Sequence, residues 1–382
     1  MKTIYLDAAA TSKPHPEVVK AMMPYFDTYW HNPSSLYAAG VKVKDDIDTA
    51  KKAVADFINA DNNEIYFTSS GSEGNSWAIQ GFINYCYNNM KKPIIITTTI
   101  EHKSILYCLE NNDIAMKRYV PVDSDGFIDI EELESLLDYY SKLPQCDILV
   151  SVQFANNEVG TIQNIEEIGR IIHKHNAILH SDAVQAFGQI PIDVKKLGID
   201  MLTVSGHKIG CPKGIGFLYK SNSVDIKPLI YGGQMRGMRG GTENVPYIIG
   251  MAKAVDLAND KINHYPDMIA RRDYFIGELE KIGCTLNGSA TQRLPNNINV
   301  MLPYELSGES LLYLLDMCDI QIGVGSACNN DSILPSPVLS AMGKRKDAHR
   351  AIRITFSYGL TKDDIDYVVN EIRKQIELLG KE

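Results

Sequence analysis

Short apolar runs alternate with amphipathic stretches from about residue 15 to residue 255. The runs predicted to be strands are 65–67, 94–97, 148–152, 178–179, 201–204 and 216–219. Between them, segments such as 165–175 place their apolar residues at helical spacing. Strands that alternate with helices are typical of α/β domains, so we expect a mainly parallel sheet covered by helices.

The C-terminal part of the chain has a different pattern. The elements expected there are a long charged helix over 251–279, a strand over 297–301 and a helix over 308–315. Thr361 and Asp364 then form a capping-box pattern, and apolar residues recur at helical spacing up to residue 379, with Gly380 placed to end the helix. This mixture predicts an α+β unit.

The length of 382 residues favours two domains over one small core. We predict a large α/β domain over 13–255 and a smaller α+β domain formed by 1–12 and 256–382. The composition is ordinary for a globular protein, with 45% apolar and 22% charged residues.

Charge and cysteine content exclude several classes of protein. A net charge of −9 gives no general attraction for nucleic acid. No apolar run approaches the length of a membrane span, and the N-terminus has no signal-peptide core, so we expect a cytoplasmic protein. The seven cysteines form no Cys-x-x-Cys pair, which argues against a disulfide framework and a zinc site. No metal site is predicted.

Polar groups follow several of the predicted strands. Asp182 follows the apolar residues 177–179, and Lys208 follows the strand at 201–204. Carboxyl ends of parallel strands meet at one edge of a sheet, so the two side chains are expected to lie close together. A lysine beside a carboxylate suits Schiff-base chemistry on an aldehyde cofactor. Either residue alone is more simply read as a surface lysine or a helix-capping aspartate.

A hydroxyl-rich turn follows the strand at 65–67 and leads into a predicted helix. Gly71 and Ser72 lie in this turn, and backbone N–H groups at a helix start favour an anion such as phosphate. Simple N-capping by serine would give the same pattern. Ser205 and His207 could also donate to a phosphate, and His102 could stack on a flat ring and move protons.

Many ordered motifs resemble those of cysteine desulfurases, in the class V aminotransferase superfamily of pyridoxal-phosphate fold type I enzymes. The motifs that carry the resemblance are 5–11, 32–35, 70–73, 101–103, 156–160, 182–185, 205–208, 212–216, 236–242, 325–328 and 351–353. The resemblance runs nearly from end to end and implies a large domain with a seven-stranded type of sheet. The block at 325–328, Gly-Ser-Ala-Cys, favours desulfuration over transamination.

The resemblance also implies roles for individual residues. Lys208 would carry pyridoxal 5'-phosphate, Asp182 would pair with its ring nitrogen, and His102 would stack on the ring and move protons. The other residues implied to bind the cofactor are Gln185 and Asn157 at the ring oxygen, and Gly71, Ser72, Ser205, His207 and Thr242 at the phosphate. Thr242 would come from a second subunit, which implies a homodimer with shared sites. Arg353, with Asn157 nearby, would bind the substrate carboxylate through its bidentate fork.

Cys328 is implied to be the nucleophile. Its thiolate would attack the sulfur of L-cysteine, leaving a persulfide on Cys328 and releasing L-alanine. The sulfur would pass to an acceptor such as an iron–sulfur scaffold protein or a tRNA-thiolation protein. Gly323 and Gly325 would let this segment swing. Cys211 is interpreted as a packing residue.

Three departures from the family pattern are visible. Gly71 and Ser72 replace the usual Ala-Thr, Val184 stands where relatives often have Thr, and polar residues 329–331 follow Cys328. The alternatives are a selenocysteine lyase, another lyase or an aminotransferase on the same scaffold, and a protein that binds without catalysis.

Overall fold

The computed structural model describes residues 3–262, 264–325 and 335–379. Its largest sheet has seven strands in the order β2-β8-β7-β6-β5-β3-β4. The strands are β2 (Ile65–Thr68), β3 (Lys92–Thr98), β4 (Met116–Val120), β5 (Cys146–Ser151), β6 (Ile178–Asp182), β7 (Met201–Ser205) and β8 (Gly216–Lys220). β8 runs antiparallel to its neighbours β2 and β7, whereas the other pairs are parallel. The predicted mainly parallel sheet is therefore confirmed.

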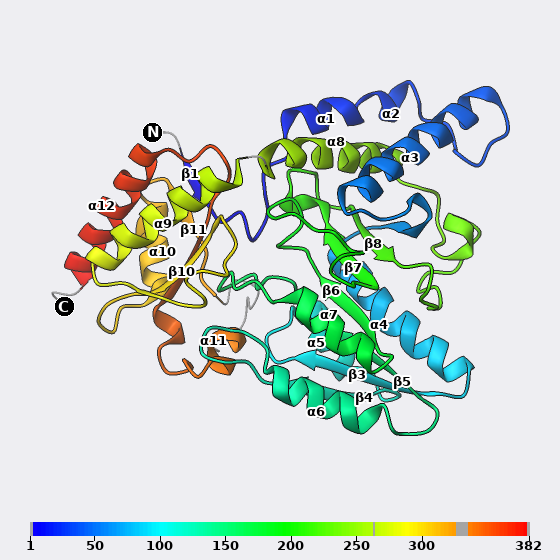
Figure 1. Ribbon diagram of the computed structural model, residues 1–382. Helices are drawn as coiled ribbons and strands as arrows, with labels where there is room; N and C mark the ends of the chain where they lie inside the picture. Colours follow the sequence, from blue (N-terminus) through cyan, green and yellow to red (C-terminus); the bar gives the residue numbers. More distant parts are fainter. Residues whose placement is uncertain (1–2, 263, 326–334, 380–382) are drawn as a thin grey trace.

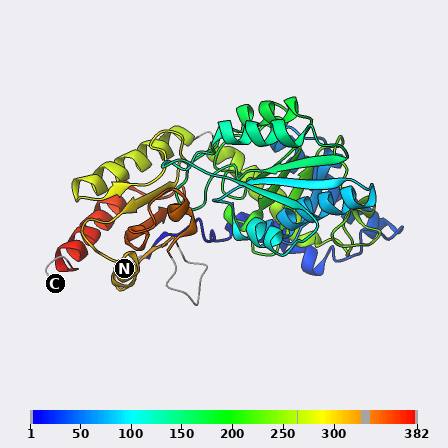
Figure 2. The ribbon, with the colours of Figure 1, turned by 90° about the horizontal axis from the view of Figure 1, so that it is seen from below.

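Helices cover both faces of this sheet (Figures 1 and 2). Along β5, Ile148 and Val150 face one helix layer while Leu149 faces the other, as the alternation of side chains along a strand requires. The first layer contains α3 (Ala38–Phe57), α6 (Ile130–Tyr140), α7 (Ile165–Lys174) and α8 (Val245–Ile262), and the second contains α4 (Gly71–Asn88) and α5 (Lys103–Glu110). Two short helices, α1 (Pro16–Met22) and α2 (Pro24–Asp27), lie against α8.

A second unit, at the left of Figure 1, has its own core. Two small sheets form it: β12-β10-β9, which is antiparallel, and the parallel pair β1-β11. Their strands are β1 (Ile4–Leu6), β9 (Thr285–Leu286), β10 (Asn297–Met301), β11 (Ile320–Ile322) and β12 (Ala351–Thr355). The helices of this unit are α9 (Tyr265–Lys281), α10 (Gly308–Asp316) and α12 (Lys362–Leu379), while α11 (Pro337–Ala341) packs between the two units.

The long helix predicted over 251–279 is wrong. The chain forms α8 and α9 instead, and α9 begins at Tyr265 with Pro266 in its first turn. Proline lacks an N–H and clashes with the preceding turn inside a helix, but it is tolerated where a helix begins. One periodic stretch therefore becomes two helices.

The capping box predicted at the start of the last helix is confirmed, because the Thr361 and Asp364 side chains each accept the other residue's backbone N–H. β4 was missed because this edge strand is only partly buried and has no apolar run. β1 pairs with β11, so the N-terminal residues lie with the second unit. The predicted domain limits, with α8 running across residue 255, stay a prediction.

Within the described ranges, no helix is both long and apolar enough to cross a membrane.

Candidate active site

A cavity of about 370 Å³ lies at the carboxyl edge of β3, β5, β6 and β7. Its volume falls in the range of small-molecule and cofactor sites. The predicted site residues that line it are Gly71, Ser72, His102, Asn157, Asp182, Gln185, Ser205, His207, Lys208 and Arg353. Residues from both units therefore meet at one cavity. Its position at the carboxyl ends of the strands is where open α/β sheets bind ligands.

Asp182 is the last residue of β6 and is almost fully buried. Its Oδ1 accepts a hydrogen bond from the Val184 N–H at 2.9 Å, and its Oδ2 accepts one from Asn75 Nδ2 at 2.7 Å. Asn75 Nδ2 also lies 2.9 Å from Ser104 Oγ. These contacts fix the carboxylate in one orientation at the cavity wall.

Lys208 ends the short 3-10 turn that follows β7. Its Nζ donates to the carbonyl oxygens of Ala9 and Ala10, at 2.5 and 2.7 Å. Gln185 Nε2 donates to the same Ala9 oxygen at 3.1 Å. The backbone that follows β1 therefore holds the amine in the cavity, which explains how the N-terminal segment contributes to the site.

His102 is the N-cap residue of α5 and lines the cavity, although part of the side chain is open to solvent. Its Nδ1 accepts from the Ser104 N–H at 3.2 Å, which places the proton of a neutral imidazole on Nε2. Burial lowers the pKa of His102, the charges of Lys208 and Lys103 lower it further, and Asp182 opposes them. The ring is therefore neutral, and able to accept a proton, at neutral pH.

The N-terminus of α4 forms a concave wall of the cavity. Gly71 begins this helix, and a Cβ added to it would lie 2.8 Å from Val184 Cγ2 and 3.4 Å from Ser205 Cβ. The backbone is therefore close-packed at a helix start, where N–H groups and the helix dipole attract anions. His207 also lines the cavity. Burial and the nearby Lys208 and Lys213 charges lower its pKa to about 4, leaving a neutral ring.

Arg353 on β12 brings a buried cation to the other side of the cavity. Its Nη2 donates to Asp7 Oδ1 at 2.7 Å, and its Nη1 donates to the Asn157 carbonyl oxygen at 3.2 Å. Its Nε is buried and has no hydrogen-bond partner among the described residues. A guanidinium fixed in this way is suited to bind a carboxylate.

Sequence reasoning missed Asn75, Asp7 and Glu101 as site residues. Glu101 is buried, and its Oε1 accepts from Thr98 Oγ1 at 2.7 Å and from the Gln153 N–H at 2.9 Å. Burial raises the pKa of Glu101 to about 8, so it is a neutral acid at pH 7. A sequence signal existed for Asn75, which is polar but lies four residues after Gly71 on the buried face of α4.

Three other predicted features have different outcomes. Thr242 is exposed and does not line the cavity of its own chain. Cys328 lies outside the described residues. Gly323 and Gly325 are in close contact with other residues: an added Cβ would lie 2.6 Å from Asp7 Oδ1 at Gly323 and 2.8 Å from Glu158 Oε2 at Gly325. Both positions therefore require glycine because a neighbouring carboxylate leaves no room for a side chain, and not only because glycine gives the backbone conformational freedom.

Cys211 is fully buried, and burial raises its pKa to about 12. Its interpretation as a packing residue is confirmed, because an un-ionised, inaccessible thiol is a poor nucleophile.

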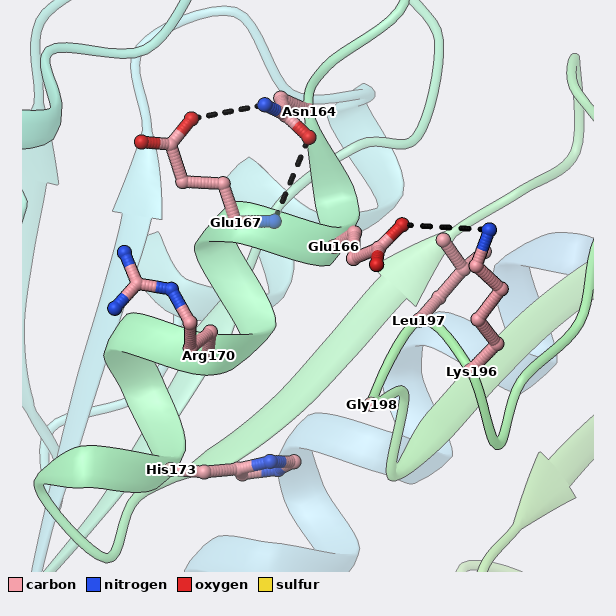
Figure 3. Close-up of a pocket in the computed structure, with 8 residues that line it drawn as sticks. All are labelled: Asn164, Glu166, Glu167, Arg170, His173, Lys196, Leu197 and Gly198. Carbon is pink, nitrogen blue, oxygen red and sulfur yellow. Dashed lines mark hydrogen bonds and ion pairs between the residues drawn. The ribbon is translucent and has the colours of Figure 1, made fainter.

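A second cavity, of about 720 Å³, lies between α7 and the turn at 196–198 (Figure 3). Its polar side chains largely bond to one another: Glu166 pairs with Lys196 at 3.7 Å, and Asn164 donates to Glu167 at 2.8 Å. His173 is likewise paired with Asp200. This surface depression has none of the strand-end groups described above.

Comparison with known proteins gives the family. The aminotransferase class-V family matches residues 4–368. The cysteine desulfurase IscS of Methanosarcina thermophila is 43% identical, covering 99% of this chain and 93% of its own length. The chain belongs to the class-V aminotransferase family, within its cysteine desulfurases. A cysteine desulfurase IscS of Clostridium botulinum is 41% identical over 98% of this chain and 95% of its own.

Solved structures of NifS-like proteins have the same fold. A NifS-like protein superposes with a TM-score of 0.90 at 33% identity, covering 99% of this chain and 100% of its own. A NifS-like protein from Rickettsia africae gives a TM-score of 0.87 at 33% identity, over 98% and 99% of the two chains. The expectation of a fold type I enzyme is therefore confirmed.

Members of this family depend on pyridoxal 5'-phosphate, and the described residues of this cysteine desulfurase fit that cofactor. The cavity contains a buried carboxylate, Asp182, and an amine, Lys208. Gly71 and Ser72 begin α4 at the cavity wall, where the backbone N–H groups of a helix start would accommodate an anion. A protonated ring nitrogen, an aldehyde and a phosphate each have a complementary group.

Proposed function

We propose that this chain removes sulfur from L-cysteine, producing L-alanine and a persulfide on Cys328. The observation that carries the proposal is that Lys208, Asp182 and Arg353 line one cavity, although they come from different elements. A further relative supports cysteine as the substrate: SspA, whose solved structure is a complex with cysteine, is 32% identical with a TM-score of 0.79, over 93% of this chain and 99% of its own.

Each side chain has a distinct role toward the cofactor. Lys208 would hold the aldehyde carbon, Asp182 the ring nitrogen, and Gln185 and Asn157 the ring oxygen. Gly71, Ser72, Ser205 and His207 would bind the phosphate, and His102 would lie against the ring. When bound, pyridoxal phosphate supplies an aldehyde for the substrate amine and a ring that withdraws electrons from the bonds around Cα.

The protein's own groups then bind the substrate and move protons. Arg353 binds the carboxylate of cysteine, and its position is fixed by Asp7 and the Asn157 carbonyl. Lys208 and the neutral His102 transfer protons at the substrate carbon atoms. The Cys328 thiolate attacks the substrate sulfur, forming an S–S bond as the C–S bond breaks. The bonding electrons stay on the carbon fragment, which gains a proton and leaves as alanine, so no external oxidant is needed.

Mass spectrometry after brief exposure to L-cysteine tests this proposal. We expect a gain of about one sulfur atom on Cys328, with a matching amount of alanine. Cys328→Ala should abolish both, and Lys208→Ala should abolish both together with covalent attachment of the cofactor. Alanine formed at the wild-type rate by Cys328→Ala would overturn the persulfide step on Cys328 and show that another thiol accepts the sulfur. Alanine that requires an added keto acid would support transamination.

We also propose a homodimer in which Thr242 completes the phosphate site of a second copy. Large apolar side chains are exposed on and near α1 to α3, and Leu36 is 96% exposed. A cavity of about 800 Å³ joins this region to the segment that precedes Thr242, because Leu36 and Val41 line it together with Met235 and Arg236. Exposed apolar side chains clustered in this way are typical of an interface.

Mixing two inactive variants tests the shared site. We pair Lys208→Ala with Thr242→Ala, unfolding and refolding the mixture. If Thr242 acts in the second copy, the mixed dimers regain one intact site, giving about a quarter of wild-type activity. If it acts within its own chain, or if the protein sediments as a monomer, no activity returns and the shared site is wrong.

Transfer of the sulfur to an acceptor protein completes the proposal. A persulfide on Cys328 blocks a second turnover until another thiol accepts the sulfur. An iron–sulfur scaffold protein or a tRNA-thiolation protein would serve, which would require the cytoplasmic location predicted above. Loss of the added sulfur mass from Cys328 on mixing with each candidate would identify the acceptor.

A further inference from the structure

Glu158 has a buried carboxyl group that the chemistry described above does not use. It follows β5 in a turn closed by a bridge between Ala155 and Ile162. Only 5% of the residue is exposed, and it lines the same cavity as Lys208. A buried acid of this kind costs free energy unless it has a partner, so its contacts require an explanation.

Glu158 contacts residues on both sides of 326–334, the Cys328 segment. Ser336 Oγ donates a hydrogen bond to Glu158 Oε2 at 2.5 Å. Gly325 lies so close that an added Cβ would be 2.8 Å from the same oxygen. Glu158 Oε2 therefore lies against Gly325, which precedes the Cys328 segment, and bonds to Ser336, which follows it.

The turn that carries Glu158 is itself fixed to the second unit. The Glu158 carbonyl oxygen accepts from the side-chain amides of Asn297 and Asn299, at 3.4 and 3.2 Å. The Asn157 carbonyl oxygen accepts from Arg353 Nη1. The same short turn therefore contacts both the predicted substrate-binding cation and the two ends of the Cys328 segment.

Ser336 also has two contacts. Besides donating to Glu158, its Oγ accepts from the Leu339 N–H at 3.1 Å and so caps α11. Val338 and Leu339 of this helix pack with Val159, the residue after Glu158. The hydrogen bond and the apolar contact therefore join the same two pieces of backbone.

We propose that Glu158 is a positioning residue for sulfur transfer, which holds Gly325 and Ser336 in register with cysteine bound at Arg353. This inference rests on the proposed function, in which Cys328 receives the sulfur. Reaction between two sulfur atoms is sensitive to their separation, and a displacement of about 1 Å can cost as much as a hundredfold in rate. Glu158 fixes the points where the Cys328 segment joins the rest of the fold.

The role depends on a hydrogen-bond acceptor rather than on charge. Burial raises the pKa of Glu158 to about 7, although the Ser336 hydrogen bond and the charges of Arg353 and Lys103 oppose it. A hydroxyl donor bonds to an oxygen of either the neutral or the ionised acid. Glutamine keeps such an oxygen, whereas alanine removes it.

The test compares Glu158→Ala, Glu158→Gln and a matched control, Glu371→Ala, in the holoenzyme. Glu371 is a buried glutamate of α12, paired with Lys374. The first measurement is hydrogen exchange at the backbone amides between residues 335 and 342, where Ser336 and 338–342 have an N–H and the two prolines do not. The second is single-turnover kinetics, which separates the absorbance change on cysteine binding from formation of the Cys328 persulfide.

Glu158→Ala should raise exchange at 335–342 and slow persulfide formation roughly tenfold, with cysteine binding changed less than about threefold. Glu158→Gln should restore both readouts to near the wild-type values, and Glu371→Ala should change neither. Unchanged exchange in Glu158→Ala, or an equal loss in cysteine binding and in persulfide formation, would overturn the inference. Absence of a persulfide in the wild-type protein would instead overturn the proposed function, and exchange would still report whether Glu158 holds these residues.

Discussion

Arg353 Nη2 lies 2.7 Å from Asp7 Oδ1, although the two residues are 346 positions apart in the chain. Asp7 follows β1 and forms a β-bridge with Thr355 of β12, which carries Arg353. The ion pair is buried, with only 7% of the Arg353 side chain and 19% of the Asp7 side chain exposed. It compensates the charge of Arg353 and fixes the fork that faces the cavity.

Asp7→Asn should lower the free energy of unfolding by roughly 3 kcal/mol, because it leaves Arg353 as a buried charge without its nearest anion. Chemical denaturation of the apoprotein measures this change. The control is Asp46→Asn, which removes a more exposed pair with Lys42 and should cost less than about 1 kcal/mol. Equal losses in the two variants would show that the Asp7–Arg353 pair has no special contribution.

The proton transfer assigned to His102 should keep a constant rate as the pH falls through 6.5 and slow only below it. His102 must be neutral to accept a proton, and burial together with Lys208 and Lys103 lowers its pKa below the ordinary value of 6.5. The active form is thus present above the lowered pKa and is lost as the pH falls through it. The acid limb of the single-turnover absorbance change after cysteine addition measures this position, because that change does not require the Cys328 thiolate.

His102→Gln should reduce kcat/KM about a hundredfold and remove that acid limb. His173→Gln is the control, because His173 is a surface residue paired with Asp200 and should leave the profile unchanged. An acid limb that persists in His102→Gln would assign it to another group.

Asn75→Ala should weaken binding of pyridoxal phosphate to the apoprotein about tenfold. Asn75 donates to Asp182 Oδ2, so its loss removes a hydrogen bond that orients the buried carboxylate. Titration of apoprotein with the cofactor measures the affinity. Asn112→Ala, which removes another buried amide that caps a turn at 114–115, should lower stability but leave cofactor affinity unchanged.

Gly71→Ala should weaken cofactor binding about tenfold, because the new Cβ would meet Val184 Cγ2 at 2.8 Å and displace the start of α4. Val184→Ala alone should have little effect. The double variant should regain most of the affinity, since the second change removes the clashing methyl group. Additive effects in this cycle would show that the two residues do not interact.

Much of this protein follows from its sequence. Runs such as Ile94 to Thr97 are apolar on both faces of a strand, which is the pattern that a sheet buried by two helix layers produces. Polar residues placed after parallel strands must meet at one edge, so Asp182 and Lys208 could be assigned to one site without coordinates. The motifs around them also sufficed to indicate the family.

Only the tertiary structure decided the rest, because burial and partners depend on residues far apart in the chain. The role inferred for Asp7 depends on its ion pair with Arg353. The role inferred for Glu158 depends on its contacts with Gly325 and Ser336. Glu101 became a neutral acid because the fold removes water from it. β4 was missed because its place at the sheet edge comes from pairing with β3 rather than from its own apolar pattern. The local pattern of apolar and polar residues determines the helices, the strands and the sheet edge at which the functional side chains meet. Long-range packing determines the charge and orientation of each of these side chains.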